Sequence, residues 1–119
     1  MELIEKNQEL YAILKTKIHI GDAKITSLHI YILNDLLTID VDIRLLLGTG
    51  KHVRLRFTDV DEYSFNHNKF YYFYNIETYK FILQDNLYYI SFDPDTGLED
   101  ASPIDNDTIL CGSIEGYYI

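Results

Sequence analysis

Apolar residues stand at every second position from Leu37 to Leu47, and most positions between them are polar. This period of two predicts a strand with one buried and one solvated face. The preceding stretch, residues 23–34, also alternates, with apolar residues on both faces. Asn34 and Asp35 lie between the two stretches and favour a tight turn. We therefore expect the two strands to form a long hairpin.

A third strand is predicted over residues 53–58, after a break at Gly48-Thr49-Gly50. The polar positions within it include two arginines, and the preceding strand carries two aspartates in equivalent positions. We expect these side chains to form exposed cross-strand ion pairs, each worth about 0–1 kcal/mol. The four residues are Arg54, Arg56, Asp40 and Asp42.

The beginning of the chain is predicted to be a helix over residues 2–15. Leu3, Leu10 and Leu14 fall at helical spacing. Acidic residues come early in this stretch and lysines come late, which suits the helix dipole. We expect its apolar stripe to pack on the sheet.

The second half of the chain is rich in aromatic residues. The pattern around Tyr63 and Phe65 predicts a short strand, and the aromatic run 70–74 favours another, because aromatic residues have high β-propensity. Residues 79–92 predict a second hairpin, with its turn at Gln84-Asp85-Asn86.

The last part of the chain predicts a loop followed by a strand. Residues 95–107 hold five acidic residues and few apolar ones, which is typical of a loop. The last strand is predicted from Thr108 to Tyr118, with Leu110, Ile114 and Tyr118 available to the core. Together, these elements predict an α+β fold, with one N-terminal helix packed on a mostly antiparallel sheet of six to eight strands. A length of 119 residues predicts a single domain over residues 1–119.

The net charge limits the classes of partner. Nineteen acidic and ten basic residues give a formal charge of −9. This balance argues against binding to nucleic acid or to an anionic membrane surface, because both need clustered Lys and Arg. No segment has the ~18–20 apolar residues of a membrane helix. The charged start of the chain lacks the apolar core of a signal peptide, so we expect a cytoplasmic protein.

The excess of acidic residues is concentrated in the last third of the chain. Residues 1–80 hold eleven acidic and all ten basic residues, whereas residues 81–119 hold eight acidic residues and no base. Fourteen of the seventeen aromatic residues lie from Tyr63 onward. An acidic segment with interleaved tyrosines is typical of a surface that contacts a basic protein. The alternative interpretation is a solvated, turn-rich end of the sheet.

The residue pattern predicts no enzyme, cofactor or metal site. The sequence has no glycine-rich phosphate loop, and its four histidines lack the spacing of metal ligands. Cys111 is the one cysteine and lies among apolar and acidic residues, which predicts a buried, inert thiol. Counted from Asp93, positions six and twelve are Leu98 and Ile104, where an EF-hand needs glycine and glutamate. A weak calcium site of another kind stays open.

Two short motifs flank the predicted hairpin and third strand. Asp22-Ala23-Lys24-Ile25 leads into the first strand, and Phe57-Thr58-Asp59-Val60 ends the third. They resemble a group of small bacterial immunity proteins from toxin–immunity systems, including polymorphic toxins and contact-dependent inhibition. Residues 87–94 and 105–107 resemble the C-terminal half of the same group. Gly21 stands where that group has a histidine, so the role of that histidine is not carried over.

The resemblance implies that the chain binds and neutralises a cognate toxin domain, often a basic nuclease, in the cytoplasm and without catalysis. We expect acidic side chains to steer the encounter and tyrosines to supply buried contact. The predicted partner-binding residues are Asp93, Asp95, Glu99, Asp100, Asp105, Asp107, Tyr88, Tyr117 and Tyr118. On its own, the chain is expected to be a monomer or a weak dimer.

Two other hypotheses stay open at this point. The first is a homo-oligomeric structural or interaction module that associates through its Tyr-rich strands. The second is a binder of a small ligand on the aromatic-rich sheet.

Overall fold

The elements of the fold are known from a computed structural model that describes residues 1–46 and 51–119. In these residues one helix follows a short first strand and precedes six further strands. The elements are β1 (Glu2–Lys6), α1 (Asn7–Thr16), β2 (Lys24–Leu33), β3 (Leu36–Arg44), β4 (His52–Ser64), β5 (Lys80–Gln84), β6 (Leu87–Asp93) and β7 (Asn106–Tyr118). The predicted α+β fold, mainly β with an N-terminal helix, is confirmed.

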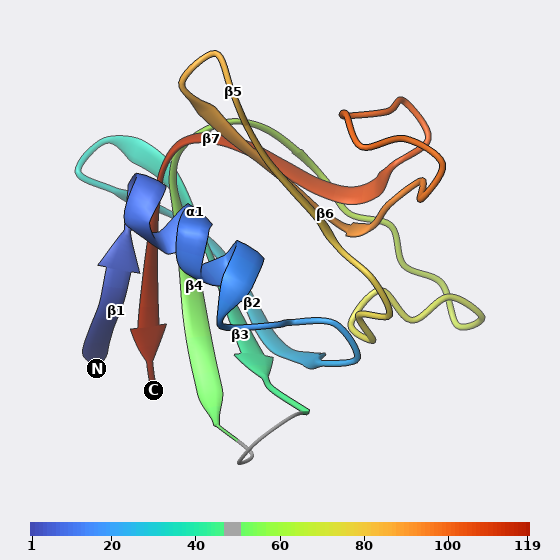
Figure 1. Ribbon diagram of the computed structural model, residues 1–119, viewed down its shortest axis with the longest axis horizontal. Coiled ribbons are helices and arrows are strands. Elements are labelled where there is room, and N and C mark those ends of the chain that lie inside the picture. Colours follow the sequence, from blue (N-terminus) through green and yellow to red (C-terminus); the bar gives the residue numbers. More distant parts are fainter. Residues whose placement is uncertain (47–50) are drawn as a thin grey trace.

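All strand pairs are antiparallel, and the sheet order is β2-β3-β4-β7-β6-β5. The long strand β7 has β4 along one side. Its other side is shared, because β6 pairs with the first half of β7 and β1 pairs with the last residues. Figure 1 shows the result: the two chain ends lie side by side and α1 packs against one face of a curved sheet. No described helix is long and apolar enough to cross a membrane.

The two predicted hairpins are confirmed. β2 and β3 turn at Asn34 and Asp35, and β5 and β6 turn at Asp85 and Asn86. All four turn residues have positive φ, between 52° and 63°, which Asn and Asp tolerate better than other non-glycine residues. The predicted strand end at Leu47 and the break at Gly48-Thr49-Gly50 lie outside the described residues.

The predicted helix over residues 2–15 is wrong in its first part. Residues 2–6 form β1, which pairs with the end of β7, and the helix begins only at Asn7. Leu10 and Leu14 are buried, as their helical spacing predicted, but Leu3 is exposed on the strand. Pairing with β7 supplies the backbone of β1 with hydrogen-bond partners, and this long-range contact outweighs the local helical pattern.

The aromatic run 70–74 is not a strand. It lies in an irregular segment, residues 65–79, whose only bridges are Asn68 with Tyr71 and Asn75 with Lys24. The aromatic side chains pack in a cluster, with Phe73 between Phe65 and Tyr74 at ring-centre distances of 6.2 and 5.8 Å. Packing of the rings, together with backbone hydrogen bonds to the start of β2, therefore organises this segment in place of a regular strand.

Two strands are longer than predicted, and one register differs. β4 continues to Ser64 and so includes the predicted short strand at Tyr63, with a register shift after Val60. In β7, Ile114 is buried as predicted, and Tyr118 packs partly on the core. Leu110 is only half-buried, because Ile109 and Cys111 face inward instead. Ile109 pairs with the equally buried Ile90 of β6, which sets this register.

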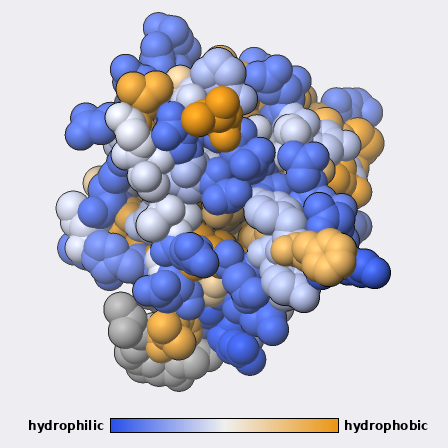
Figure 2. Space-filling model, turned by 90° about the vertical axis from the view of Figure 1, so that its right-hand side faces the viewer, coloured by the Kyte–Doolittle hydropathy of each residue, from blue (hydrophilic) through white to orange (hydrophobic). Residues whose placement is uncertain are grey.

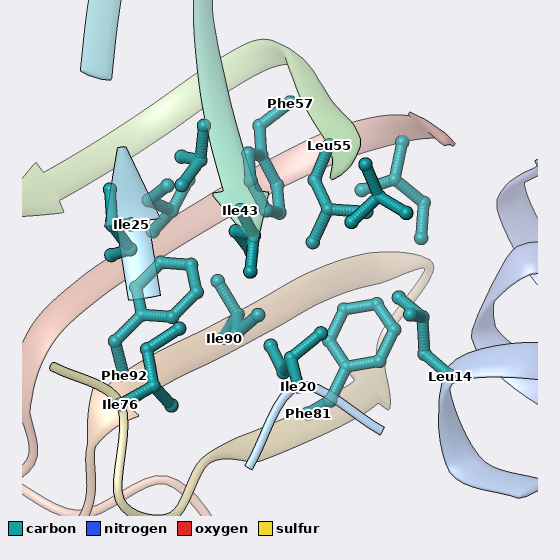
Figure 3. Packing of buried hydrophobic residues seen from close by; sticks show 14 of the residues in the cluster. Leu14, Ile20, Ile25, Ile43, Leu55, Phe57, Ile76, Phe81, Ile90 and Phe92 are labelled. Carbon is teal, nitrogen blue, oxygen red and sulfur yellow. The ribbon is translucent and has the colours of Figure 1, made fainter. Parts of the chain in front are cut away.

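Buried side chains from both halves of the chain form one hydrophobic cluster. Figure 3 shows Leu14 of α1 close to Phe81 of β5, with Ile20 beside Phe81, Ile90 of β6 further along and Phe57 of β4 across the layer. The helix approaches the sheet closely, since Leu10 packs against the backbone of Gly116. This arrangement fixes the positions of β5, β6 and the loop that follows them.

Candidate functional site

Residues 94–105, here called the acidic loop, connect β6 to β7 and are anchored by Asp105. The Asp105 carboxylate accepts hydrogen bonds from Lys80 Nζ at 2.9 Å and from the Tyr89 hydroxyl at 2.6 Å. The backbone N–H groups of Asp95 and Ser102 donate to the same carboxylate at 2.7 and 2.9 Å. Its side chain is 0% exposed. Asp105 therefore holds the loop in place instead of facing a partner.

The environment of Asp105 favours its charged form. Burial opposes ionisation, but the hydrogen bonds from Tyr89, Ser102, Lys80 and Asp95 outweigh it and lower the pKa of Asp105 to about 2. Lys80 is the last base in the sequence and is itself buried beside this carboxylate. Its charge is neutralised inside the protein, so it does not offset the acids on the loop surface.

Asp93 and Asp107 hold the aromatic segment to the sheet. The Tyr71 hydroxyl lies within hydrogen-bond distance of both carboxylates, 2.8 Å from Asp93 Oδ2. The backbone N–H of Asn66 donates to Asp107 at 2.9 Å, and Asp107 is fully buried. Burial and the two acids raise the pKa of Tyr71. Both predicted binding residues are thus tied to their own chain, and Asp107 has no exposed surface to offer a partner.

The remaining predicted acids lie at the surface of the acidic loop. Glu99 and Asp100 are exposed, and Asp95 is half-buried, accepting the Gly97 N–H at 3.0 Å. Lys80 Nζ donates to the Asp100 carbonyl at 2.8 Å and so fixes the backbone of Asp100. The side chain of Asp100 stays in solvent. Figure 2 shows this side of the molecule as mainly hydrophilic, with hydrophobic residues in separate small groups.

A groove with a volume of about 560 Å³ runs between the acidic loop, α1 and the start of β5. One wall carries Asp95, Leu98, Glu99 and Asp100, and the other carries aromatic side chains. We call this site the acidic groove; the aromatic residues that line it are Tyr11, Tyr79 and Phe81.

The aromatic wall of the acidic groove is held rigidly by the helix. The Tyr79 hydroxyl donates to the Leu14 carbonyl at 2.9 Å, and the Tyr11 ring packs on Phe81 at 5.1 Å. Lys15 also lines the groove, with its ammonium 5.4 Å from the centre of the Tyr11 ring. The sequence patterns did not point to Tyr11 or Tyr79 as site residues, because only the folded chain brings them next to the loop.

The three predicted tyrosines do not join this site. Tyr88 is 5% exposed and stacks on Phe81 in the core. Tyr117 and Tyr118 lie at the end of β7, whereas the acidic loop precedes its start, 13 residues away along the strand. β7 runs from Asn106 to Tyr118, so the two groups lie at opposite ends of this strand. The nine predicted residues therefore do not form one surface.

The predicted ion pairs between β3 and β4 are confirmed, but they are not exposed. Arg56 binds Asp40 through two hydrogen bonds of 2.9 and 3.1 Å, and Arg54 binds Asp42 in the same way at 2.7 and 2.9 Å. Asp40 is only 7% exposed, and its carboxylate also accepts the Tyr31 hydroxyl at 3.0 Å. Asp40 raises the pKa of Arg56. Both aspartate carboxylates therefore have their hydrogen-bond partners within the sheet.

The buried thiol is confirmed as well. Cys111 is 0% exposed, and burial raises its pKa to about 12, so it carries no thiolate near neutral pH. Within residues 1–46 and 51–119, no group of three or more His, Cys, Asp or Glu side chains is arranged to hold a metal ion.

Comparison of the chain with protein-family models, with curated proteins and with solved structures gives no match.

Proposed function

We propose that this protein is an immunity protein that binds a cognate, basic toxin domain at the acidic groove and blocks it. The observation that carries the proposal is the unbalanced negative surface of the acidic loop. Glu99 and Asp100 are exposed there, Lys80 is buried against Asp105, and exposed Lys15 lines the opposite side of the groove. Within the described residues neither carboxylate takes part in an ion pair, so both are free to meet a basic surface.

The loop presents its acids in a fixed arrangement. Four donors converge on Asp105, and the Lys80 ammonium also binds the Asp100 carbonyl. A preorganised loop loses little conformational entropy when a partner binds, so more of the interaction energy appears as affinity. The carboxylates also steer a basic partner toward the groove over long distances and increase the association rate.

The groove offers apolar contact beside the charges. Tyr11, Tyr79 and Leu98 line it together with Pro94. Aromatic residues at the centre of an interface, surrounded by polar residues, are typical of the positions that supply most of the binding energy. Neutralisation by this route needs tight binding alone and no chemical step. We further propose a cytoplasmic location, where such a protein would meet an incoming toxin.

The first experiment is co-expression of this chain with the C-terminal domain encoded by the gene immediately upstream, which the proposal expects to be a toxin. Rescue of growth supports the proposal. Continued growth arrest, with the chain soluble and in excess, contradicts it.

The second experiment measures the binding kinetics of the purified pair. The double variant Glu99→Lys with Asp100→Lys should associate at least about tenfold more slowly at low salt. The matched control is Glu2→Lys with Glu5→Lys, which makes the same charge change at exposed positions of β1. Equal slowing in both variants would show that the association rate depends on the net charge of the chain and not on the carboxylates at the acidic groove.

A further inference from the structure

β2 forms the outer edge of the sheet at the end opposite to β5. Its first residues already have a partner on this outer side. The Ile25 N–H donates to the Tyr74 carbonyl at 2.8 Å, and the Ile76 N–H donates to the Ala23 carbonyl at 3.0 Å. From Ser27 to Leu33, β2 pairs with β3 alone among the described strands. Seven residues of edge strand are thus left open.

This open stretch has none of the usual protection of an edge strand. Residues 27–33 contain no charged residue and no proline, and they pair regularly with β3. The one register shift of β2 lies before them, between Ile25 and Ser27. Ile30 and Ile32 are 38% and 64% exposed. A long, regular and uncharged edge with exposed apolar residues is a template for pairing with another strand.

We propose that a second copy of this chain pairs antiparallel with β2 through residues 27–33, continuing the sheet across a two-fold axis. The open stretch is centred on Ile30, which places that residue opposite its own copy. Leu28 then lies opposite Ile32, so the apolar side chains of both copies share one face of the joined sheet. On the other face, His29 lies opposite Tyr31.

The charge distribution favours a second copy over a basic partner at this edge. Residues 27–33 have no carboxylate, and Asp40 and Asp42 of the neighbouring strand are already bound to Arg56 and Arg54. A basic protein would find no counter-charge here, whereas an identical uncharged edge meets no repulsion. The exposed acids Glu99 and Asp100 follow β6, near the far edge of the sheet, so they do not face each other in the pair.

The pairing leaves the acidic groove accessible in both copies, because the groove is at β5 and the contact is at β2. Dimerisation and partner binding are therefore independent properties, and one variant can remove the first without the second.

Sedimentation velocity of the full chain over a concentration series tests the proposal. The wild-type chain should sediment as a monomer–dimer equilibrium. Ile30→Lys places two ammonium groups opposite each other on the axis and should weaken dimerisation at least tenfold, about 1.4 kcal/mol. The matched control is Gln84→Lys, which adds the same charge to the exposed end of the other edge strand, β5, and should leave the equilibrium unchanged.

Hydrogen exchange gives a second measurement that needs no variant. Amides of residues 27–33 should become more protected as the concentration of the wild-type chain rises, while those of β5 do not change. A chain that stays monomeric at its highest soluble concentration overturns the proposal. A dimer that persists in folded Ile30→Lys, or that forms without added protection of residues 27–33, overturns it equally.

Discussion

The side-chain oxygen of Asn7 accepts a hydrogen bond from the backbone N–H of Ile114 at 2.9 Å. It also accepts the Ser113 hydroxyl at 3.0 Å. Along this side of β7, pairing with β6 ends at Cys111 and pairing with β1 starts at Glu115. Asn7 therefore supplies an acceptor at the point where the strand changes partners, and its φ of 47° turns the chain from β1 into α1.

Replacing Asn7 tests this junction. Asn7→Leu removes the acceptor for a partly buried N–H and puts a branched side chain at positive φ, so it should lower the free energy of unfolding by about 1–3 kcal/mol. Asn7→Asp keeps both the oxygen and the tolerance of positive φ and should stay close to wild type. Chemical denaturation of the two variants measures the difference; equal losses would contradict the role of the oxygen.

Gly116 is expected to resist any added side chain. A Cβ at this position would lie 2.7 Å from Cδ1 of the buried Leu10, so Gly116→Ala must displace the helix or force Leu10 from its position. The expected loss is about 1–3 kcal/mol of stability, as for other overpacked cores. At Gly21 the nearest atom would be 3.5 Å away, and Gly21→Ala is the matched control. A melting temperature lowered equally by both changes would contradict the close helix packing.

The lowered pKa of Asp105 predicts a specific sensitivity to acid. Its value of about 2 in the folded chain lies below the ordinary 3.8, so the unfolded chain takes up the proton first. The stabilising contribution is complete above about pH 5 and is lost as the pH falls toward about 2. Asp105→Asn should be less stable at neutral pH but lose less stability between these two pH values.

The control for this measurement is Asp35→Asn, which removes an exposed carboxylate in a turn and keeps a residue that tolerates positive φ. Its unfolding free energy should follow the wild-type dependence on pH. If the unfolding free energy changes equally steeply with pH in the Asp105 and Asp35 variants, the buried Lys80–Asp105 pair does not stabilise the fold in the way described.

Tyr71→Phe should release the aromatic segment locally. The change removes the hydroxyl between Asp93 and Asp107 and keeps the ring, and a lost hydrogen bond of this kind costs about 1 kcal/mol. We expect faster proteolysis within residues 65–79 and faster exchange of the Asn66 amide, with little change in β3 and in residues 27–33 of β2. Tyr72→Phe is the control, since the Tyr72 side chain is exposed. Unchanged proteolysis in Tyr71→Phe would show that ring packing alone holds the segment.

Local patterns predicted most of the strands. Alternation of apolar and polar residues predicted β3 and the first part of β4, and the paired Asn and Asp residues predicted both hairpin turns. Both predictions succeed because strand faces and tight turns depend on neighbouring residues. The pattern failed at residues 2–6, where a helix-like spacing of leucines was overridden by pairing with Tyr117 and Tyr118. It also failed at residues 70–74, where β-propensity was overridden by packing of rings.

The candidate site was predicted only in part. Sequence composition located the acidic loop to within two residues, but it did not separate exposed Glu99 and Asp100 from Asp105, whose side chain is 0% exposed, and buried Asp107. All four are carboxylates in one polar stretch, so composition assigns them the same role. Burial depends on which donors reach each carboxylate, and Lys80 is 25 residues from Asp105.

By itself, the sequence determined the antiparallel strands, their turns and the accumulation of acids after Lys80, since these follow from spacing, backbone preference and charge along the chain. Only the tertiary structure decided which of those acids face solvent. It also brought Tyr11 and Tyr79 beside the acidic loop and left residues 27–33 of β2 open at the sheet edge. The physical reason is that burial and pairing are properties of contacts between distant segments. Three ion pairs among the described residues join three acids to three bases and so leave the net charge of −9 unchanged, and the acidic groove carries part of that charge through Asp95, Glu99 and Asp100.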